Sequence, residues 1–272
     1  MTSLPEPSLR STLRRLFRVE NRRAAIRRGR IERLDDFSRL VTVYLPPGYD
    51  EHSERRYPVL YMQDGQNLFD ADRAYIPGQH WRLSEAADAA IGERTTSPLI
   101  LVGVDHAGPA RIDEYTPTLD PRHKAGGRAN DYARLLLEEL MPLIDERFRT
   151  LPGEAGTGGS SLGGLVSLYL ALKHPKTFSR AAVMSPSVWW NQRAILRDVD
   201  SFEGPRPRIW LDIGSREGKE AVEDSRALRD RLRARGWDES KLRYYEDRRG
   251  DHSERAWARR VRQALEFLFP AA

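Results

Sequence analysis

The sequence contains no cysteine. This absence excludes disulfide bonds, thiolate nucleophiles and cysteine-ligated zinc. No apolar run approaches the ~20 residues that a transmembrane helix needs, and the first residues lack the apolar core of a secretory signal. No internal repeat is visible. We therefore expect a cytoplasmic protein with no membrane span.

Lysine is also scarce, because 40 of the 45 basic residues are arginine. The net charge of +5 comes from the N-terminal part, where residues 1–40 hold eleven arginines against five acidic residues. That part has neither the interleaved aromatic residues of nucleic-acid binders nor a known DNA-binding motif. We expect a basic segment over residues 1–30, one catalytic domain over residues 31–272, and no nucleic-acid partner.

Short β-like runs alternate with helical patterns along the 272 residues. We expect strands over 39–46, 57–65, 97–105, 155–159, 180–187, 208–215 and 242–247. We expect helices over 82–92, 129–148, 162–173, 222–235 and 254–268. This alternation predicts the α/β class, with a mainly parallel central sheet and helices on both faces. In such sheets, functional residues gather in loops at the carboxyl ends of the strands.

A glycine-rich stretch, "TGGSSLGGL", precedes the most apolar predicted helix. The pattern G-x-S-x-G, typical of a nucleophilic serine on a strand–turn–helix elbow, fits only Gly159 to Gly163. Ser161 is then the candidate nucleophile and Ser160 its neighbour. The alternative is a glycine-rich turn before a core helix.

A serine hydroxyl needs a base to take its proton. Among six histidines, His252 follows the last predicted strand and precedes an amphipathic helix. It is the candidate base, and His106 is its rival as a substrate contact. The alternative for His252 is a helix-start residue beside Ser253 as N-cap.

The imidazole needs an acid on its other nitrogen. Glu217 is the best-placed candidate, in the loop after the strand "RIWLDI". Asp212 is its rival, although it lies within that strand. The order serine, acid, histidine is the order found in α/β-hydrolases.

Several separate motifs in the same order resemble an esterase family of the α/β-hydrolase fold that includes esterase D, feruloyl esterases and enterobactin esterases. They are "RRYPVLYMQDGQNLFD", "LILVGVDHAGPARIDEYTP", "GGSSLGGLVSLYLALKHPKTFSRAAVMSPSVWW", "IWLDIGSREG" and "GDHSERAWARRVRQALEFLF". The resemblance runs from about residue 30 to the C-terminus. It implies the α/β-hydrolase fold and ester hydrolysis, a histidine at 252 and an acid near 217. Some relatives lack a good acid.

Two backbone N–H groups are expected to bind the oxyanion of the tetrahedral intermediate. One belongs to Leu162, directly after the nucleophile. The other is that of Gln66 in the loop "DGQN", where Gly65 permits a close approach. The alternative is that this loop is only a polar turn.

The candidate substrate-binding residues are Asn67, Arg111 and the pair Trp189 and Trp190. Arg111 could hold an acidic or catechol-bearing acyl group; the alternative is a surface ion pair with Glu114. The glycines near Ser161 lack the lysine of a phosphate-binding loop. No metal-ligand cluster is visible, so we expect no cofactor and no metal.

These observations predict a serine carboxylic ester hydrolase that acts on a small-molecule ester through an acyl-enzyme on Ser161. A siderophore esterase of the enterobactin type and an acyltransferase are alternatives on the same scaffold. A third alternative is a catalytically inactive binding module.

Overall fold

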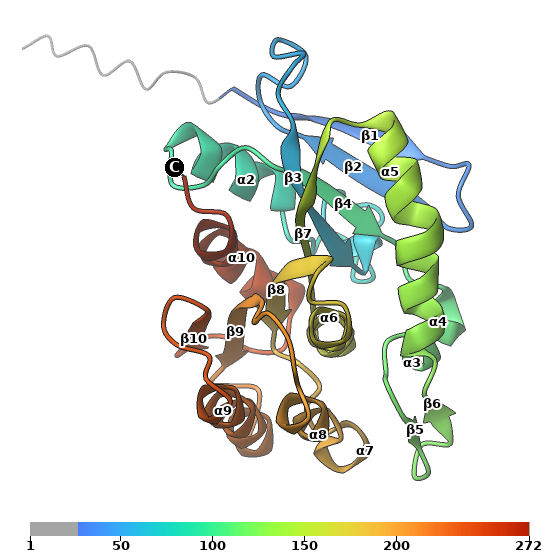
Figure 1. Cartoon of the computed structure of the whole chain (residues 1–272), viewed down its shortest axis with the longest axis vertical. Helices are drawn as coiled ribbons and strands as arrows, with labels where there is room; N and C mark the ends of the chain where they lie inside the picture. Colours follow the sequence, from blue (N-terminus) through green and yellow to red (C-terminus); the bar gives the residue numbers. More distant parts are fainter. Residues whose placement is uncertain (1–26, 272) are drawn as a thin grey trace, which may run out of the picture.

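A computed structural model describes residues 27–271 of the chain. Most of the basic segment predicted over residues 1–30 lies outside the described residues. The central feature is an eight-stranded sheet with the order β1-β2-β4-β3-β7-β8-β9-β10 (Figure 1). Its strands are β1 (Arg30–Leu34), β2 (Val41–Leu45), β3 (Tyr57–Gln63), β4 (Ile100–Val104), β7 (Thr150–Ser160), β8 (Phe178–Met184), β9 (Arg208–Gly214) and β10 (Leu242–Asp247).

The sheet is antiparallel only at one edge. There β1 pairs with β2 and β2 with β4, both antiparallel. From β4 to β10 every neighbouring pair is parallel. The predicted α/β class with a mainly parallel sheet is therefore confirmed. The carboxyl ends of six parallel strands consequently lie at one edge of the sheet.

Helices surround this sheet. They are α2 (Leu83–Gly92), α3 (Arg111–Glu114), α4 (Ala129–Arg134), α5 (Met141–Arg147), α6 (Leu162–Lys173), α7 (Trp190–Arg193), α8 (Ile195–Asp200), α9 (Lys219–Ala234) and α10 (Glu254–Leu268). Short 3₁₀ turns η1 (Gly65–Asn67) and η2 (Gly108–Ala110), a π-helical segment η3 (Leu135–Leu140) and a small hairpin β5 (Leu119–Asp120) and β6 (Ala125–Gly126) complete the described elements. Within residues 27–271, no helix is both long enough and apolar enough to span a bilayer.

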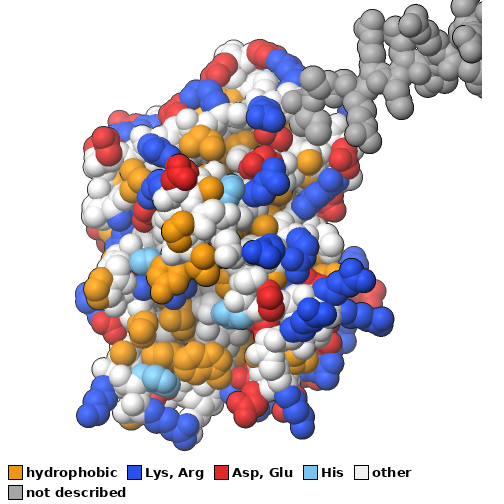
Figure 2. All heavy atoms as spheres, turned by 180° about the vertical axis from the view of Figure 1, so that it is seen from behind, with side chains coloured by type: hydrophobic (Ala, Val, Ile, Leu, Met, Phe, Trp, Pro, Cys, Tyr) orange, Lys and Arg blue, Asp and Glu red, His pale blue; other side chains and the backbone are white. Residues whose placement is uncertain are grey.

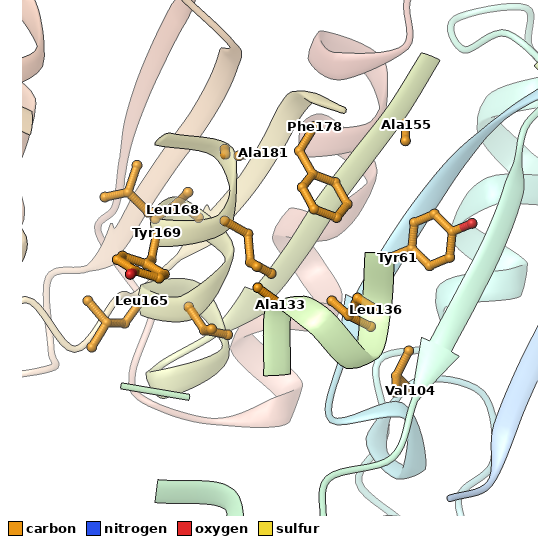
Figure 3. Packing of buried hydrophobic residues seen from close by; sticks show 14 of the residues in the cluster. Tyr61, Val104, Ala133, Leu136, Ala155, Leu165, Leu168, Tyr169, Phe178 and Ala181 are labelled. Atoms are coloured by element: carbon orange, nitrogen blue, oxygen red, sulfur yellow. The ribbon is translucent and has the colours of Figure 1, made fainter. Parts of the chain in front are cut away.

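Alternating strand residues supply two separate cores. Tyr61 of β3 packs on the face covered by α6, α8, α9 and the α4–α5 region, whereas its neighbours Leu60 and Met62 pack on the face covered by α2 and α10. Figure 3 shows the first core, with Phe178 of β8 beside the apolar side chains of α6. The sheet is thus buried on both faces, which is why its central strands are continuously apolar.

The predicted strands and longer helices are all present; the strand over 242–247 and the helices over 162–173 and 254–268 have the predicted ends, and the others are shifted. The strand predicted over 155–159 begins at Thr150, and the helix predicted over 129–148 consists of α4, η3 and α5. Pro142, the second residue of α5, has no N–H to donate, and the segment before it is π-helical. The four-residue helices α3 and α7 were not predicted, because such short elements carry no measurable periodicity.

Candidate active site

Three of the predicted functional residues meet at the carboxyl edge of the sheet. Ser161 follows β7, Glu217 lies in the loop after β9, and His252 lies in the loop between β10 and α10. Residues almost a hundred positions apart in the chain are brought together, because parallel strands β7, β8, β9 and β10 lie side by side.

The backbone at Ser161 makes a sharp turn. Its φ of 57° and ψ of −121° are unusual for a residue with a side chain. A Cβ on Gly159 would lie 2.9 Å from the carbonyl carbon of Gly163, and one on Gly164 would lie 2.9 Å from the carbonyl oxygen of Met184. Both glycines are therefore required by close backbone approach between β7, α6 and β8.

The three polar side chains form a continuous hydrogen-bonded chain. Ser161 Oγ lies 3.0 Å from His252 Nε2, and His252 Nδ1 lies 2.6 Å from Glu217 Oε2. The Ser161 hydroxyl also lies 3.3 Å from that of Ser187. Ser253 caps α10 by accepting the N–H of Ala256. A hydroxyl, an imidazole and a carboxylate joined in this order form an arrangement that can activate a serine hydroxyl.

The Glu217 carboxylate is buried and fully hydrogen-bonded, with a side chain 2% exposed. Its Oε1 accepts the Ser185 hydroxyl at 2.6 Å and the Gly214 N–H at 2.7 Å. Burial alone would raise the pKa of Glu217. The hydrogen bonds from His252 and Ser185 outweigh burial and hold this pKa below its ordinary value. Glu217 is therefore ionised at neutral pH.

Asp212, the rival acid, does not contact His252. Its carboxylate accepts the Trp210 indole N–H at 2.7 Å and the Ser185 backbone N–H at 3.3 Å. Burial raises the pKa of Asp212 to about 6, although the nearby Arg260 opposes this shift. Asp212 lies within β9, and its carboxylate faces Trp210 and Arg260 rather than the imidazole of His252.

Arg260 lies between these two carboxylates, and sequence reasoning missed it. Its Nη2 is 3.3 Å from Asp212 Oδ1 and 3.7 Å from Glu217 Oε1, and donates to the Ser185 hydroxyl at 2.9 Å. The residue is only 1% exposed. One feature of the sequence could have indicated its burial: Arg260 stands next to Val261 and three residues after Trp257, on the apolar stripe of α10.

A cleft of about 400 Å³ opens in front of Ser161 and His252. It is lined by Asp64, Gln66, Asn67, Tyr75, His106, Gly108, Pro109, Arg111, Ile112, Ser160, Ser161, His252, Glu254 and Trp257. His106 lines this cleft but accepts the N–H of Gly108 instead of contacting Ser161. Figure 2 shows a face on which exposed apolar side chains gather beside histidine side chains.

The two predicted oxyanion donors lie at helical starts near this cleft. Leu162 is the first residue of α6, and Gln66 lies in η1 after β3. Within residues 27–271, neither backbone N–H has a hydrogen-bond partner. A Cβ on Gly65 would lie 2.6 Å from the carbonyl carbon of Gly103, so this glycine lets the loop approach β4. Both N–H groups are available to a ligand.

Arg111 lies in the cleft, but its guanidinium is already occupied. Its Nε and Nη2 donate to the two carboxylate oxygens of Asp64 at 2.7 and 2.8 Å. The predicted alternative, an ion pair with Glu114, is wrong, because Glu114 binds Arg39 at 2.8 and 3.0 Å. Although the two residues lie within one turn of the short helix α3, their side chains have partners from different parts of the chain.

Asn67 and Glu254 belong to the inner wall of the cleft. The Asn67 amide donates to Glu254 Oε1 at 3.0 Å and accepts the Tyr75 backbone N–H at 2.8 Å. The Trp81 indole donates to the other Glu254 oxygen. Glu254 was missed in the sequence, because an acid in the first turn of a helix is ordinarily a solvated residue.

The two tryptophans lie apart from this cleft. Trp190 is buried, and its indole donates to the Thr118 carbonyl at 2.8 Å. Trp189 is 47% exposed and lines a different hollow, which Glu217 and the start of α9 also line. The adjacent rings therefore point in different directions, one into the structure and one to the surface.

Comparisons with known proteins identify the family of this chain. The family model described as "Putative esterase" matches residues 36–268. The protein YbbA of Bacillus subtilis is 28% identical over 246 residues, which cover 85% of this chain and 93% of that protein. A siderophore enterobactin esterase of Emericella nidulans is 27% identical over 201 residues, 64% of each chain.

The fold is also shared with solved structures. The BES protein from Bacillus cereus superposes with a TM-score of 0.70 at 20% identity, over 99% of both chains. The family match covers most of the described chain and includes the loops of Ser161, Glu217 and His252. The chain is therefore a hydrolytic enzyme of the α/β-hydrolase fold and belongs to this esterase family.

Proposed function

We propose that this enzyme is a serine carboxylic ester hydrolase in which Ser161 is the nucleophile, His252 the general base and Glu217 the acid. The observation that carries this proposal is the hydrogen-bonded chain of these three side chains, which ends at Ser161 in the cleft. The strained backbone at Ser161 supports it, since such strain is concentrated at functional sites.

In the first half of the reaction, Ser161 Oγ attacks the ester carbonyl carbon while its proton passes to His252 Nε2. The Glu217 carboxylate holds the opposite ring nitrogen and stabilises the imidazolium that forms. The oxyanion receives the N–H groups of Leu162 and Gln66, each worth about 2.7–4 kcal/mol of transition-state stabilisation. The carbonyl re-forms, the alkoxide leaves as an alcohol with the proton from His252, and the acyl group remains on Ser161.

In the second half, His252 takes a proton from water as the water oxygen attacks the acyl carbon. Collapse of this second tetrahedral intermediate returns the proton to Ser161 Oγ and releases the carboxylic acid. An added alcohol that replaces water in this half would give acyl transfer. Product analysis in the presence of a simple alcohol separates the two reactions.

Labelling with a fluorophosphonate probe tests the proposal directly. We expect the enzyme to be labelled on Ser161, and Ser161→Ala to lose both labelling and hydrolysis of p-nitrophenyl acyl esters, by about 10⁴–10⁶-fold in kcat. Ser160→Ala is the matched control and should still be labelled. An unlabelled wild-type protein would identify an inactive binding module, and labelling lost only in Ser160→Ala would overturn the choice of nucleophile.

A siderophore ester is a second candidate substrate. The observation that favours it is the similarity to a siderophore enterobactin esterase of Emericella nidulans. Hydrolysis of a catecholate trilactone, measured beside short p-nitrophenyl esters, tests this candidate. A kcat/KM for the trilactone far below that for the simple esters would argue against it.

A further inference from the structure

The inner wall of the cleft carries charged groups that the proposed reaction does not use. Asp64, Arg111 and Glu254 all line it, together with Ser161 and His252. Asp64 and Glu254 are buried, at 7% and 8% exposure. Buried ionisable groups in a substrate cleft are candidates for a functional role.

The charges do not balance. Arg111 gives both nitrogens of its fork to Asp64, so these two residues form a neutral bidentate pair. The Glu254 carboxylate accepts hydrogen bonds only from the neutral groups of Asn67 and Trp81. Among the described residues, Glu254 forms no ion pair with an arginine or a lysine, although Arg111 is near enough to oppose the rise of its pKa. When Glu254 is ionised, the wall therefore has one carboxylate without an ion-pair partner and no guanidinium free for an anion.

The same cleft also carries an exposed aromatic residue. Tyr75 is 80% exposed and lines the same cleft. Asn67 links the two features, because it accepts the Tyr75 backbone N–H and donates to Glu254. An exposed aromatic side chain in the same cleft as a carboxylate without an ion-pair partner is a combination that can attract organic cations.

We propose that the cleft selects esters that carry a positively charged group and discriminates against esters that carry an anionic group, with Glu254 and Tyr75 as the selecting residues. This inference rests on the proposed function, since it takes Ser161 as the reacting group. It reverses the expectation that Arg111 holds an acidic acyl group, because Asp64 occupies that guanidinium. It competes with the second candidate substrate named above, because a catecholate ester that carries anionic groups would be disfavoured by this wall.

The test uses three p-nitrophenyl esters of similar length and different terminal charge: 4-(trimethylammonio)butanoate, 5-methylhexanoate and monoglutarate. We expect kcat/KM to be about tenfold or more higher for the cationic ester than for the anionic one, with the neutral ester between them. Equal values for all three would overturn the inference while leaving the proposed function intact. No hydrolysis of any ester, together with no fluorophosphonate labelling, would overturn the proposed function instead.

Two substitutions locate the selectivity. Glu254→Gln should reduce the ratio of cationic to anionic kcat/KM toward unity. Asp64→Asn should free the Arg111 fork and raise kcat/KM for the anionic ester specifically. Glu114→Gln is the matched control, because Glu114 pairs with Arg39 and does not line the cleft. If Glu114→Gln changes the ratio as much as Glu254→Gln does, the selectivity does not come from the cleft wall.

The wild-type enzyme provides a measurement that needs no variant. Burial and the neighbouring Asp64 raise the pKa of Glu254 to about 7, against the opposing effects of Trp81, Arg111 and His252. The ratio of cationic to anionic kcat/KM should therefore rise as pH increases through 7. Protonation of His252 affects both esters equally and cancels in this ratio. A ratio that is constant between pH 6 and 8 would contradict the role of Glu254 in selection. Equal losses of kcat for all three esters in Glu254→Gln would also contradict it, and would assign Glu254 to stabilising the imidazolium of His252.

Discussion

Two arginines flank the candidate site, and they are used in opposite ways. Arg111, in front of Ser161, is one-quarter exposed and forms a bidentate pair with the single carboxylate of Asp64. Arg260, behind Glu217, is almost completely buried and lies near two carboxylates without a bidentate geometry with either. Its Nε and Nη1 have no hydrogen-bond partner among the described residues.

The difference follows from what each arginine must do. A bidentate pair cancels the charge of its carboxylate and fixes the position of both side chains. A shared guanidinium leaves two carboxylates with only one positive charge between them, so the buried region behind the site is net negative. Arg111 holds a carboxylate of the cleft wall, whereas Arg260 lies 3.7 Å from the Glu217 carboxylate that binds His252.

The largest expected effect distinguishes the two carboxylates next to Arg260. Glu217→Gln should lower kcat by about 10⁴-fold, because the amide removes the charge and can favour the wrong imidazole tautomer. Asp212→Asn is the matched control and should retain far more activity, since Asp212 does not contact His252. Steady-state kinetics on p-nitrophenyl esters measures both. If the control loses more activity than Glu217→Gln, Asp212 is the acid; if neither matters, Ser161 and His252 act as a dyad.

Removal of the shared guanidinium should destabilise the fold. Arg260→Met leaves Asp212 and Glu217 without their common cation, and breaking a buried ion pair costs about 3–5 kcal/mol. Chemical denaturation measures this loss in the free energy of unfolding. Arg260→Lys keeps the charge and should recover part of the stability and of kcat. A loss below ~1 kcal/mol in Arg260→Met would show that this guanidinium is not required.

The pH dependence of stability should report Asp212. Its pKa is raised to about 6 in the folded protein, so between about pH 4 and 6 the folded chain holds a proton that the unfolded chain has lost. The free energy of unfolding should therefore fall as pH rises through this range, with a contribution from Asp212 of about 3 kcal/mol. Denaturation at several pH values checks this, and Asp212→Asn should show a shallower slope than the wild type. Equal slopes would mean that Asp212 titrates normally.

The smallest expected effect concerns the arginine in front of the site. Arg111→Lys keeps the charge opposite Asp64 but loses the bidentate geometry, at a cost of about 1.5 kcal/mol in stability. Thermal unfolding measures it, and Arg39→Lys on the neighbouring pair with Glu114 provides a control of the same type. A larger loss for Arg111→Lys than for Arg260→Lys would reverse the comparison between the two arginines.

The sequence alone determined the fold class, the order of serine, acid and histidine along the chain, and the candidates Ser161 and His252. It favoured Glu217 over Asp212 without deciding between them. It could do so because these features depend on local patterns: apolar runs for buried strands, glycines at a tight turn, and polar residues directly after strands. The elbow register followed from steric need, since only one frame puts glycine on both sides of a serine. The order along the chain then placed Glu217 and His252 after neighbouring parallel strands.

Only the tertiary structure decided which charged side chains pair with one another. Arg111 stands three residues from Glu114 in the sequence, yet it pairs with Asp64, which follows a different strand. Glu254 has the sequence appearance of a solvated helix residue, yet it is buried against Asn67 and Trp81 from a distant part of the chain. Arg260 lies on the apolar stripe of α10, but the carboxylates near it come from β9 and the loop that follows. Charge pairing depends on distances across the fold and on burial, which no local pattern encodes. The charge balance of the cleft, and with it the expected substrate class, is therefore a property of the assembled sheet edge.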